Sequence, residues 1–184
     1  MKPNHLLCIL LAGLLICGCA GPWQKAPAVL STPRWTAAIP GGWMRLAMAD
    51  YDMFSKDGTH LHYILIQERP LEKSFRFTRN RIENGMLPHE VAETVLDDLR
   101  ADPQIRNFKV LRNAPANVGG IMGFRLTYGY IDPMGVEMRT EYYGALLPGA
   151  LFNLRYTAAR RHYFDKYQAE FDQVYRSLHL KNAP

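Results

Sequence analysis

Four segments typical of β-strands follow one another between Phe108 and Thr157, and the connections between them are short. Two of these connections carry turn residues, at Asp132–Gly135 and at Pro148–Gly149. A parallel pair of strands needs a crossover of a dozen or more residues, whereas an antiparallel pair needs only a tight turn. The second half of the chain is therefore predicted to form an antiparallel sheet.

Two segments on either side of this series have helical periodicity. The first covers residues 89–101 and is stopped by Asp102-Pro103. The second covers residues 163–178 and carries the strongest periodic signal in the chain, a mainly aromatic stripe that is most simply the face packed against a sheet. The stripe consists of Phe164, Tyr167, Phe171, Val174, Tyr175 and Leu178.

Further strands are expected at residues 35–39, 51–55 and 61–67, and Asp57-Gly58 predicts a hairpin between the last two. The order of elements is then strands, helix, four strands, helix. This order predicts one α+β domain over residues 34–184, with an antiparallel sheet of about six to seven strands covered by two main helices. Residues 70–87 are not assigned to any element.

The N-terminus resembles the signal of bacterial lipoproteins. Lys2 precedes an apolar run of 11 residues from Leu6 to Ile16, which suits a signal peptide and is too short to span a bilayer as a helix. Ile16-Cys17-Gly18-Cys19 then resembles a lipobox. The resemblance implies that residues 1–18 are removed and that Cys19 carries the lipid. Because Ala20 replaces the aspartate that often retains lipoproteins at the inner membrane, we expect the outer membrane, facing the periplasm.

Residues 19–33 contain three prolines and are predicted to form an extended tether between lipid and domain. Cys8, Cys17 and Cys19 all precede the predicted domain. The domain is therefore expected to lack disulfides, a thiol nucleophile and a cysteine metal site.

The order of elements resembles that of the PsbP-like group, from about Trp35 to Leu180. The shared features include an Ile-Pro-Gly-Gly-Trp turn at Ile39–Trp43 and a final helix ending Phe171-x-x-Val174-x-x-Ser177. The group includes a photosystem extrinsic subunit, a nuclear Ran-binding protein and several bacterial envelope lipoproteins. The resemblance implies a mainly non-enzymatic domain that binds or stabilises protein partners, with no catalytic residues to carry over.

A basic stretch interleaved with Phe75 and Phe77 is the most unusual local composition. Such a mixture suits anionic lipid headgroups, polyanionic glycans or an acidic protein surface. The alternative is a solvated loop or edge strand kept soluble by charge. The candidate contact residues are Arg69, Lys73, Arg76, Arg79 and Arg81.

Two sets of residues could bind a metal ion. His60 and His62 are two apart at the start of a predicted strand and would share a face, although no third ligand is evident. His89, Glu90 and Glu93 would share a helix face. Ordinary surface histidines are the simpler interpretation of both sets, and no metal or other cofactor is assigned.

The sequence gives no support for nucleotide or nucleic-acid binding. No glycine-rich phosphate-binding motif is present, and a formal charge of +5 is too small to indicate nucleic-acid binding. The leading hypothesis is a membrane-anchored envelope lipoprotein with a non-catalytic domain that binds a protein partner and assists assembly or stability of a membrane complex. The alternatives are a binder of an apolar or lipidic ligand and an envelope metalloenzyme or hydrolase.

Overall fold

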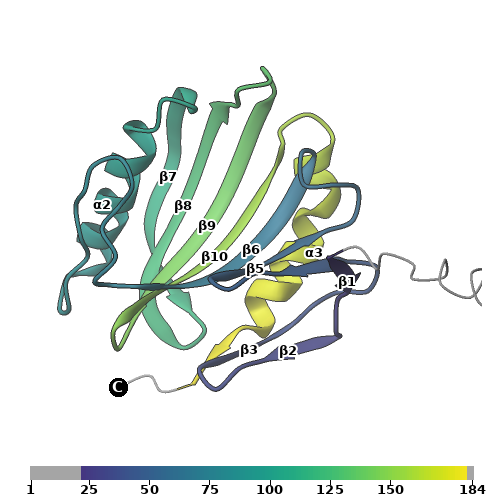
Figure 1. The fold of residues 1–184 in the computed structure, drawn as a ribbon, viewed down its shortest axis with the longest axis horizontal. Coiled ribbons are helices and arrows are strands. Elements are labelled where there is room, and N and C mark those ends of the chain that lie inside the picture. The colour runs from purple at the N-terminus through teal and green to yellow at the C-terminus, as the bar shows by residue number, and fades with distance from the viewer. Residues whose placement is uncertain (1–21, 182–184) are drawn as a thin grey trace, which may run out of the picture.

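The computed structural model describes residues 22–181, which form two antiparallel sheets and two α-helices (Figure 1). The large sheet has eight strands in the order β1–β4–β5–β6–β10–β9–β8–β7, and the small sheet has the order β11–β3–β2. The large sheet comprises β1 (Trp23–Lys25), β4 (Met44–Ala47), β5 (Tyr51–Ser55), β6 (His62–Pro70), β7 (Arg106–Val118), β8 (Ile121–Ile131), β9 (Glu137–Leu147) and β10 (Ala150–Ala159). The remaining elements are β2 (Val29–Ser31), β3 (Trp35–Ala38), β11 (His179–Leu180), α2 (Pro88–Arg100) and α3 (Tyr163–Ser177).

The α+β class, the antiparallel pairing and the two covering helices are confirmed, but the number of strands is larger than predicted. The large sheet has eight strands where six to seven were expected, and a second sheet of three lies beside it. The additional strands β1, β2, β4 and β11 have two to four residues each. Segments this short contain too few residues to show an alternating pattern.

The segment expected as a tether contributes to both sheets. β1 pairs with β4 at one edge of the large sheet, and β2 pairs with β3 in the small sheet. Leu30 in β2 is buried. Within the described residues, the first strand therefore begins at Trp23, four positions after Cys19, and not at residue 34. Cys19 and the predicted signal peptide lie outside the described residues.

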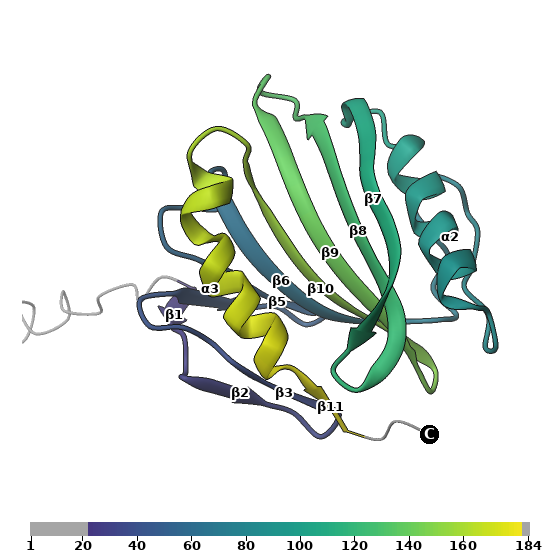
Figure 2. The same cartoon turned by 180° about the vertical axis from the view of Figure 1, so that it is seen from behind.

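Helix α3 lies between the large and the small sheet (Figures 1 and 2). Phe164, Tyr167, Phe171 and Val174 are buried there, as the aromatic stripe predicted. The Trp35 ring of the small sheet meets the ring of a β10 phenylalanine edge-on, with centroids 5.9 Å apart. One continuous hydrophobic core therefore joins the two sheets through α3.

The opposite face of the large sheet carries α2. Successive residues of a strand point to opposite faces, and on β10 Phe152 belongs to the core beneath α3 whereas Leu151 belongs to the core beneath α2. Residues 71–87, here called the crossing segment, run from β6 to α2 without helix or strand and bury Leu71, Phe75 and Ile82 in the second core (Figure 1).

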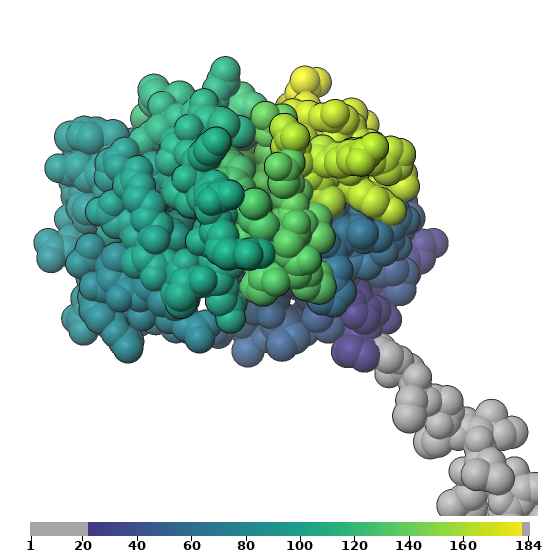
Figure 3. All heavy atoms as spheres, turned by 90° about the horizontal axis from the view of Figure 1, so that it is seen from above, coloured from purple at the N-terminus to yellow at the C-terminus, as the bar shows by residue number. Residues whose placement is uncertain are grey.

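The two helices occupy opposite ends of the molecule. Figure 3 shows the teal atoms of the α2 region at one end and the yellow atoms of α3 at the other, beside the purple N-terminal strands. Between residues 22 and 181, no helix combines the length and apolar character needed to cross a bilayer.

Candidate functional site

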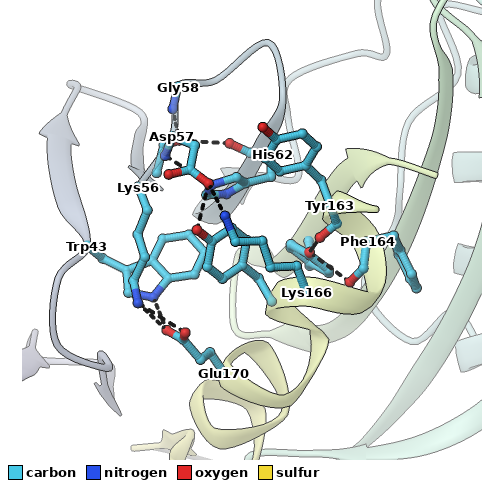
Figure 4. Close-up of polar contacts among 12 residues, drawn as sticks. Trp43, Lys56, Asp57, Gly58, His62, Tyr163, Phe164, Lys166 and Glu170 are labelled. Atoms are coloured by element: carbon cyan, nitrogen blue, oxygen red, sulfur yellow. Dashed lines mark hydrogen bonds and ion pairs between the residues drawn. The ribbon is translucent and has the colours of Figure 1, made fainter. Parts of the chain in front are cut away.

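A polar cluster joins the β5–β6 hairpin to α3 (Figure 4). His62, the first residue of β6, is fully buried, and its ring centroid lies 4.3 Å from that of Tyr167. The Nε2 atom of His62 accepts the backbone N–H of Asp57 at 3.1 Å. The imidazole is therefore neutral with its proton on Nδ1, which has no acceptor among the described residues. Burial lowers the pKa of His62 to about 4.

The charged groups of this cluster are paired with one another. Asp57 accepts the hydroxyl of Tyr167 at 2.6 Å and pairs with Lys166 at 2.7 Å, and the hydrogen bonds from Lys166 and Tyr167 lower the pKa of Asp57. One helical turn further along, Glu170 pairs with Lys56 at 2.8 Å. These contacts fasten the hairpin to α3, so the cluster is a structural clamp.

His60 and His62, the first candidate metal pair, lie in different surroundings. His60 lies exposed in the turn before β6, because the strand begins only at His62 and the alternation of strand side chains does not extend back to residue 60. The Nε2 atom of His62 is already engaged by a backbone N–H. The two imidazoles therefore do not face a common position.

In the second candidate metal set, His89, Glu90 and Glu93, both glutamates accept hydrogen bonds from other groups. On α2, Glu90 accepts the backbone N–H of Leu87 at 2.7 Å, and Glu93 accepts the side-chain amide of Asn113 at 2.8 Å. His89 is exposed. Over residues 22–181, no group of three His, Cys, Asp or Glu side chains is arranged to hold a metal ion.

The structure divides the five basic candidates into two groups. Arg69, at the end of β6, lines one recess together with Lys73 and Arg76 of the crossing segment. Arg79 and Arg81 are exposed and lie outside this recess. Three of the five basic side chains of this stretch therefore line one recess, and the other two lie on the surface outside it.

This recess, here called the α2-face recess, lies between the crossing segment, α2 and the exposed part of the sheet, and has a volume of about 270 Å³. Its polar lining includes Gln67, Arg69, Lys73, Tyr142, Asn153 and Arg155. A second hollow of about 260 Å³ continues on the other side of Arg155, where tyrosines of β6 and β8 line it. The two hollows share Arg155 and Leu99 in their linings, so they adjoin each other, and together they are here called the groove along α2.

Two guanidinium groups in the α2-face recess lack a counter-ion. Arg155 lies over the Tyr142 ring at 5.5 Å, and Arg69 lies over the Phe75 ring at 4.1 Å. Neither arginine takes part in an ion pair with a carboxylate of residues 22–181. The Nε atom of Arg155 and one Nη atom of Arg69 are buried without an acceptor in the same part of the chain. Burial lowers the pKa of Arg69.

Three acidic side chains line the recess, and each contacts a group other than Arg69 and Arg155. Asp50 pairs with Lys73 at 3.2 Å, and Glu68 pairs with Arg34 at the same distance. Asp98 of α2 accepts two backbone N–H groups of the crossing segment, at 2.8 and 2.9 Å. None of these three carboxylates forms an ion pair with Arg69 or Arg155.

Sequence reasoning missed the contribution of β9 and β10 to this recess. Asn153, Arg155 and Thr157 alternate with apolar residues on β10, and the side chains on the other face of that strand are core residues. Polar residues at every second position of a strand in the middle of a sheet are the signal that could have indicated a lined groove.

Comparison with known proteins gives matches at the level of structure. No family model and no curated protein sequence matches the chain significantly. Cyanobacterial PsbP (CyanoP) from Synechocystis sp. superposes with a TM-score of 0.57 at 17% identity, covering 92% of this chain and 99% of that one. The fold is PsbP-like.

Two further structures share this PsbP-like fold. LpqN of Mycobacterium tuberculosis, which is involved in cell envelope biogenesis, superposes with a TM-score of 0.54 at 13% identity over 98% of this chain and 99% of its own. The Saccharomyces cerevisiae Ran-binding protein Mog1p gives 0.51 at 8% identity over 85% and 96%. The resemblance predicted from the order of elements is confirmed as a likeness of fold.

Proposed function

We propose that this chain is a membrane-anchored envelope lipoprotein whose PsbP-like domain binds a protein partner without catalysing a reaction. The observation that carries the proposal is the direct succession of a lipoprotein-type signal ending at Cys19 and a folded domain beginning at Trp23. The role in cell envelope biogenesis of LpqN and the Ran binding of Mog1p support a partner-binding role for this fold.

The polar clusters favour binding over catalysis. The buried imidazole of His62 is held as a hydrogen-bond acceptor, and the neighbouring charges of Asp57, Lys166 and Glu170 are paired within the clamp. These groups stabilise the hairpin and α3, so His62, one of the candidate residues of the alternative metalloenzyme or hydrolase, is engaged in a structural contact.

The α2-face recess favours a protein partner over an apolar ligand. The aromatic stripe of α3, the largest aromatic surface that could have lined an apolar pocket, is packed into the core beneath α3, as the sequence predicted. The groove along α2 is lined by arginine, tyrosine and amide side chains, which are typical of protein–protein contact sites.

Fatty-acid labelling in the host cell tests the anchor. We expect the wild-type protein and a Cys17→Ala control to incorporate the label and to fractionate with membranes, and a Cys19→Ala variant to do neither. An unlabelled wild-type protein found free in the medium or cytosol would overturn the anchor.

Crosslinking in intact cells tests the partner. A photo-reactive residue at the exposed position 76, at the rim of the recess, should give a specific protein adduct, whereas the same residue at the exposed position 160 should not. A protein that stays monomeric and free of adducts at both positions would contradict partner binding.

A further inference from the structure

We propose that the α2-face recess binds a carboxylate carried by an acidic segment of the partner, with Arg69 and Arg155 as its anchors. This inference rests on the proposed function, because it names the chemistry by which the partner is recognised. Its basis is the presence of two arginines in one recess, each without a carboxylate partner among the described residues and each with a buried nitrogen that lacks an acceptor.

Partly buried cations whose buried nitrogens have neither an acceptor nor an anion nearby are unfavourable in a folded protein. An unpaired N–H removed from water loses its hydrogen bonds to solvent, and a charged group loses more. A bound carboxylate would restore both the hydrogen bonds and the opposite charge. The guanidinium group suits this role because its planar N–H fork matches the two oxygens of a carboxylate.

The surroundings hold Arg155 in place. Its guanidinium lies over the Tyr142 ring, and the Tyr142 hydroxyl donates to the side-chain oxygen of Asn153. The amide nitrogen of Asn153 in turn donates to the backbone carbonyl of Leu151 at 3.0 Å. The floor of the recess is therefore built from linked side chains of β9 and β10, which keeps the arginine positioned before a ligand arrives.

The shape of the groove favours a peptide over a lipid headgroup. The recess and the adjoining hollow lie on either side of Arg155, so an extended chain can pass through both while one acidic side chain reaches the arginines. A headgroup held in a flat bilayer would not reach between α2 and the sheet. Arg76 is exposed at the rim, where it would attract an acidic segment before it docks.

A titration with model peptides tests the recess. The probes are blocked tetraglutamate and blocked tetraglutamine, added to the full-length protein in neutral detergent and followed by calorimetry. We expect tetraglutamate to bind with an affinity that falls as salt rises, and tetraglutamine not to bind. Arg69→Gln and Arg155→Gln should each weaken binding by about tenfold or more, while the control Arg160→Gln, whose side chain pairs with Glu137 outside the recess, should not change it.

Two further arms keep the test decisive. Circular dichroism shows whether the Arg69→Gln and Arg155→Gln variants are folded. An Arg76→Gln variant, altered only at an exposed position, should weaken binding by about two- to fivefold even if the other two variants do not fold. Inorganic phosphate and vesicles containing anionic phospholipid are titrated in parallel. Stronger binding of either than of tetraglutamate, or no binding of tetraglutamate, would overturn the proposal.

The outcome is independent of the anchor. Peptide binding is measured without a membrane, so an unlabelled Cys19 would leave a positive titration intact. A labelled Cys19 together with no peptide binding would remove the recess proposal and leave the proposed lipoprotein standing.

Discussion

The indole N–H of Trp43 donates to the carboxylate of Glu170 at 2.6 Å, which joins the chain just before β4 to the middle of α3 (Figure 4). Trp43 is fully buried, and the Glu170 side chain is 27% exposed. A hydrogen bond to a charged acceptor at the border of the core is stronger than one between neutral groups. The pair therefore stabilises the position of α3 against the first strands.

Removing the Glu170 carboxylate should destabilise the fold. Glu170→Ala leaves the buried indole N–H without an acceptor and should lower the free energy of unfolding by about 1–3 kcal/mol. Glu170→Gln retains an acceptor and loses only the partly exposed ion pair with Lys56, so its loss should stay below about 1 kcal/mol. Urea unfolding followed by tryptophan fluorescence measures both, and equal losses would contradict this role of the bond.

Acid should weaken the fold through His62. Its pKa is lowered from 6.5 to about 4, so between these values the unfolded chain binds a proton that the folded protein excludes. The stabilisation is complete above pH 6.5 and is lost as the pH falls towards 4. The free energy of unfolding should drop by about 2 kcal/mol from this group between pH 7 and pH 5.

Substitution identifies His62 as the source of this pH dependence. His62→Gln offers an oxygen to the Asp57 N–H and does not titrate, so its unfolding free energy should vary less with pH over this interval. The exposed His60→Gln variant serves as the control and should keep the wild-type slope. If the slope survives in His62→Gln, another group causes it.

The segment expected as a tether should contribute to stability. Leu30 is 7% exposed in β2 and packs in the core beneath α3, whereas its neighbour Val29 is 60% exposed. Leu30→Ala should lower the free energy of unfolding by about 2–5 kcal/mol, and Val29→Ala should change it by less than about 0.5 kcal/mol. Thermal unfolding compares the two; a neutral Leu30→Ala would mean that β2 does not belong to the cooperative unit.

Two strand glycines should respond differently to a methyl group. At Gly144 in β9 an added Cβ would collide with the Phe124 ring, which lies in the core beneath α2. At Gly129 in β8 the nearest atom would be the backbone oxygen of Met138, at an ordinary contact distance of 3.5 Å. Gly144→Ala should destabilise the protein by about 1–3 kcal/mol and Gly129→Ala by much less, as measured by denaturant unfolding. Similar effects at both positions would contradict this packing.

Long elements were predictable because their periodicity is repeated many times. The helix expected at 163–178 is α3, and the helix expected at 89–101 is α2, each with ends within one residue. β1 and β11 were missed because three and two residues carry no pattern, and their pairing with β4 and β3 depends on chain segments far away.

The candidate site was predictable only where its residues are close in sequence. Arg69, Lys73 and Arg76 stood out as one basic stretch, but Arg155 is supplied by a strand more than 70 positions later. The pair His60 and His62 was interpreted with the alternation of strand side chains, which does not apply to His60 because the strand begins at His62. Sheet pairing, rather than local composition, therefore decides which charges meet.

The position of β1 has a consequence for how the domain would be presented to its surroundings. Three residues lie between Cys19 and Trp23, and the four steps from one Cα to the next can extend over no more than about 14 Å. β1 and β7 are the two outer strands of the large sheet. A lipid on Cys19 would thus keep the β1 edge close to the headgroups and leave β7, with α2 beside it, as the part most accessible to molecules approaching from the aqueous side (Figure 1).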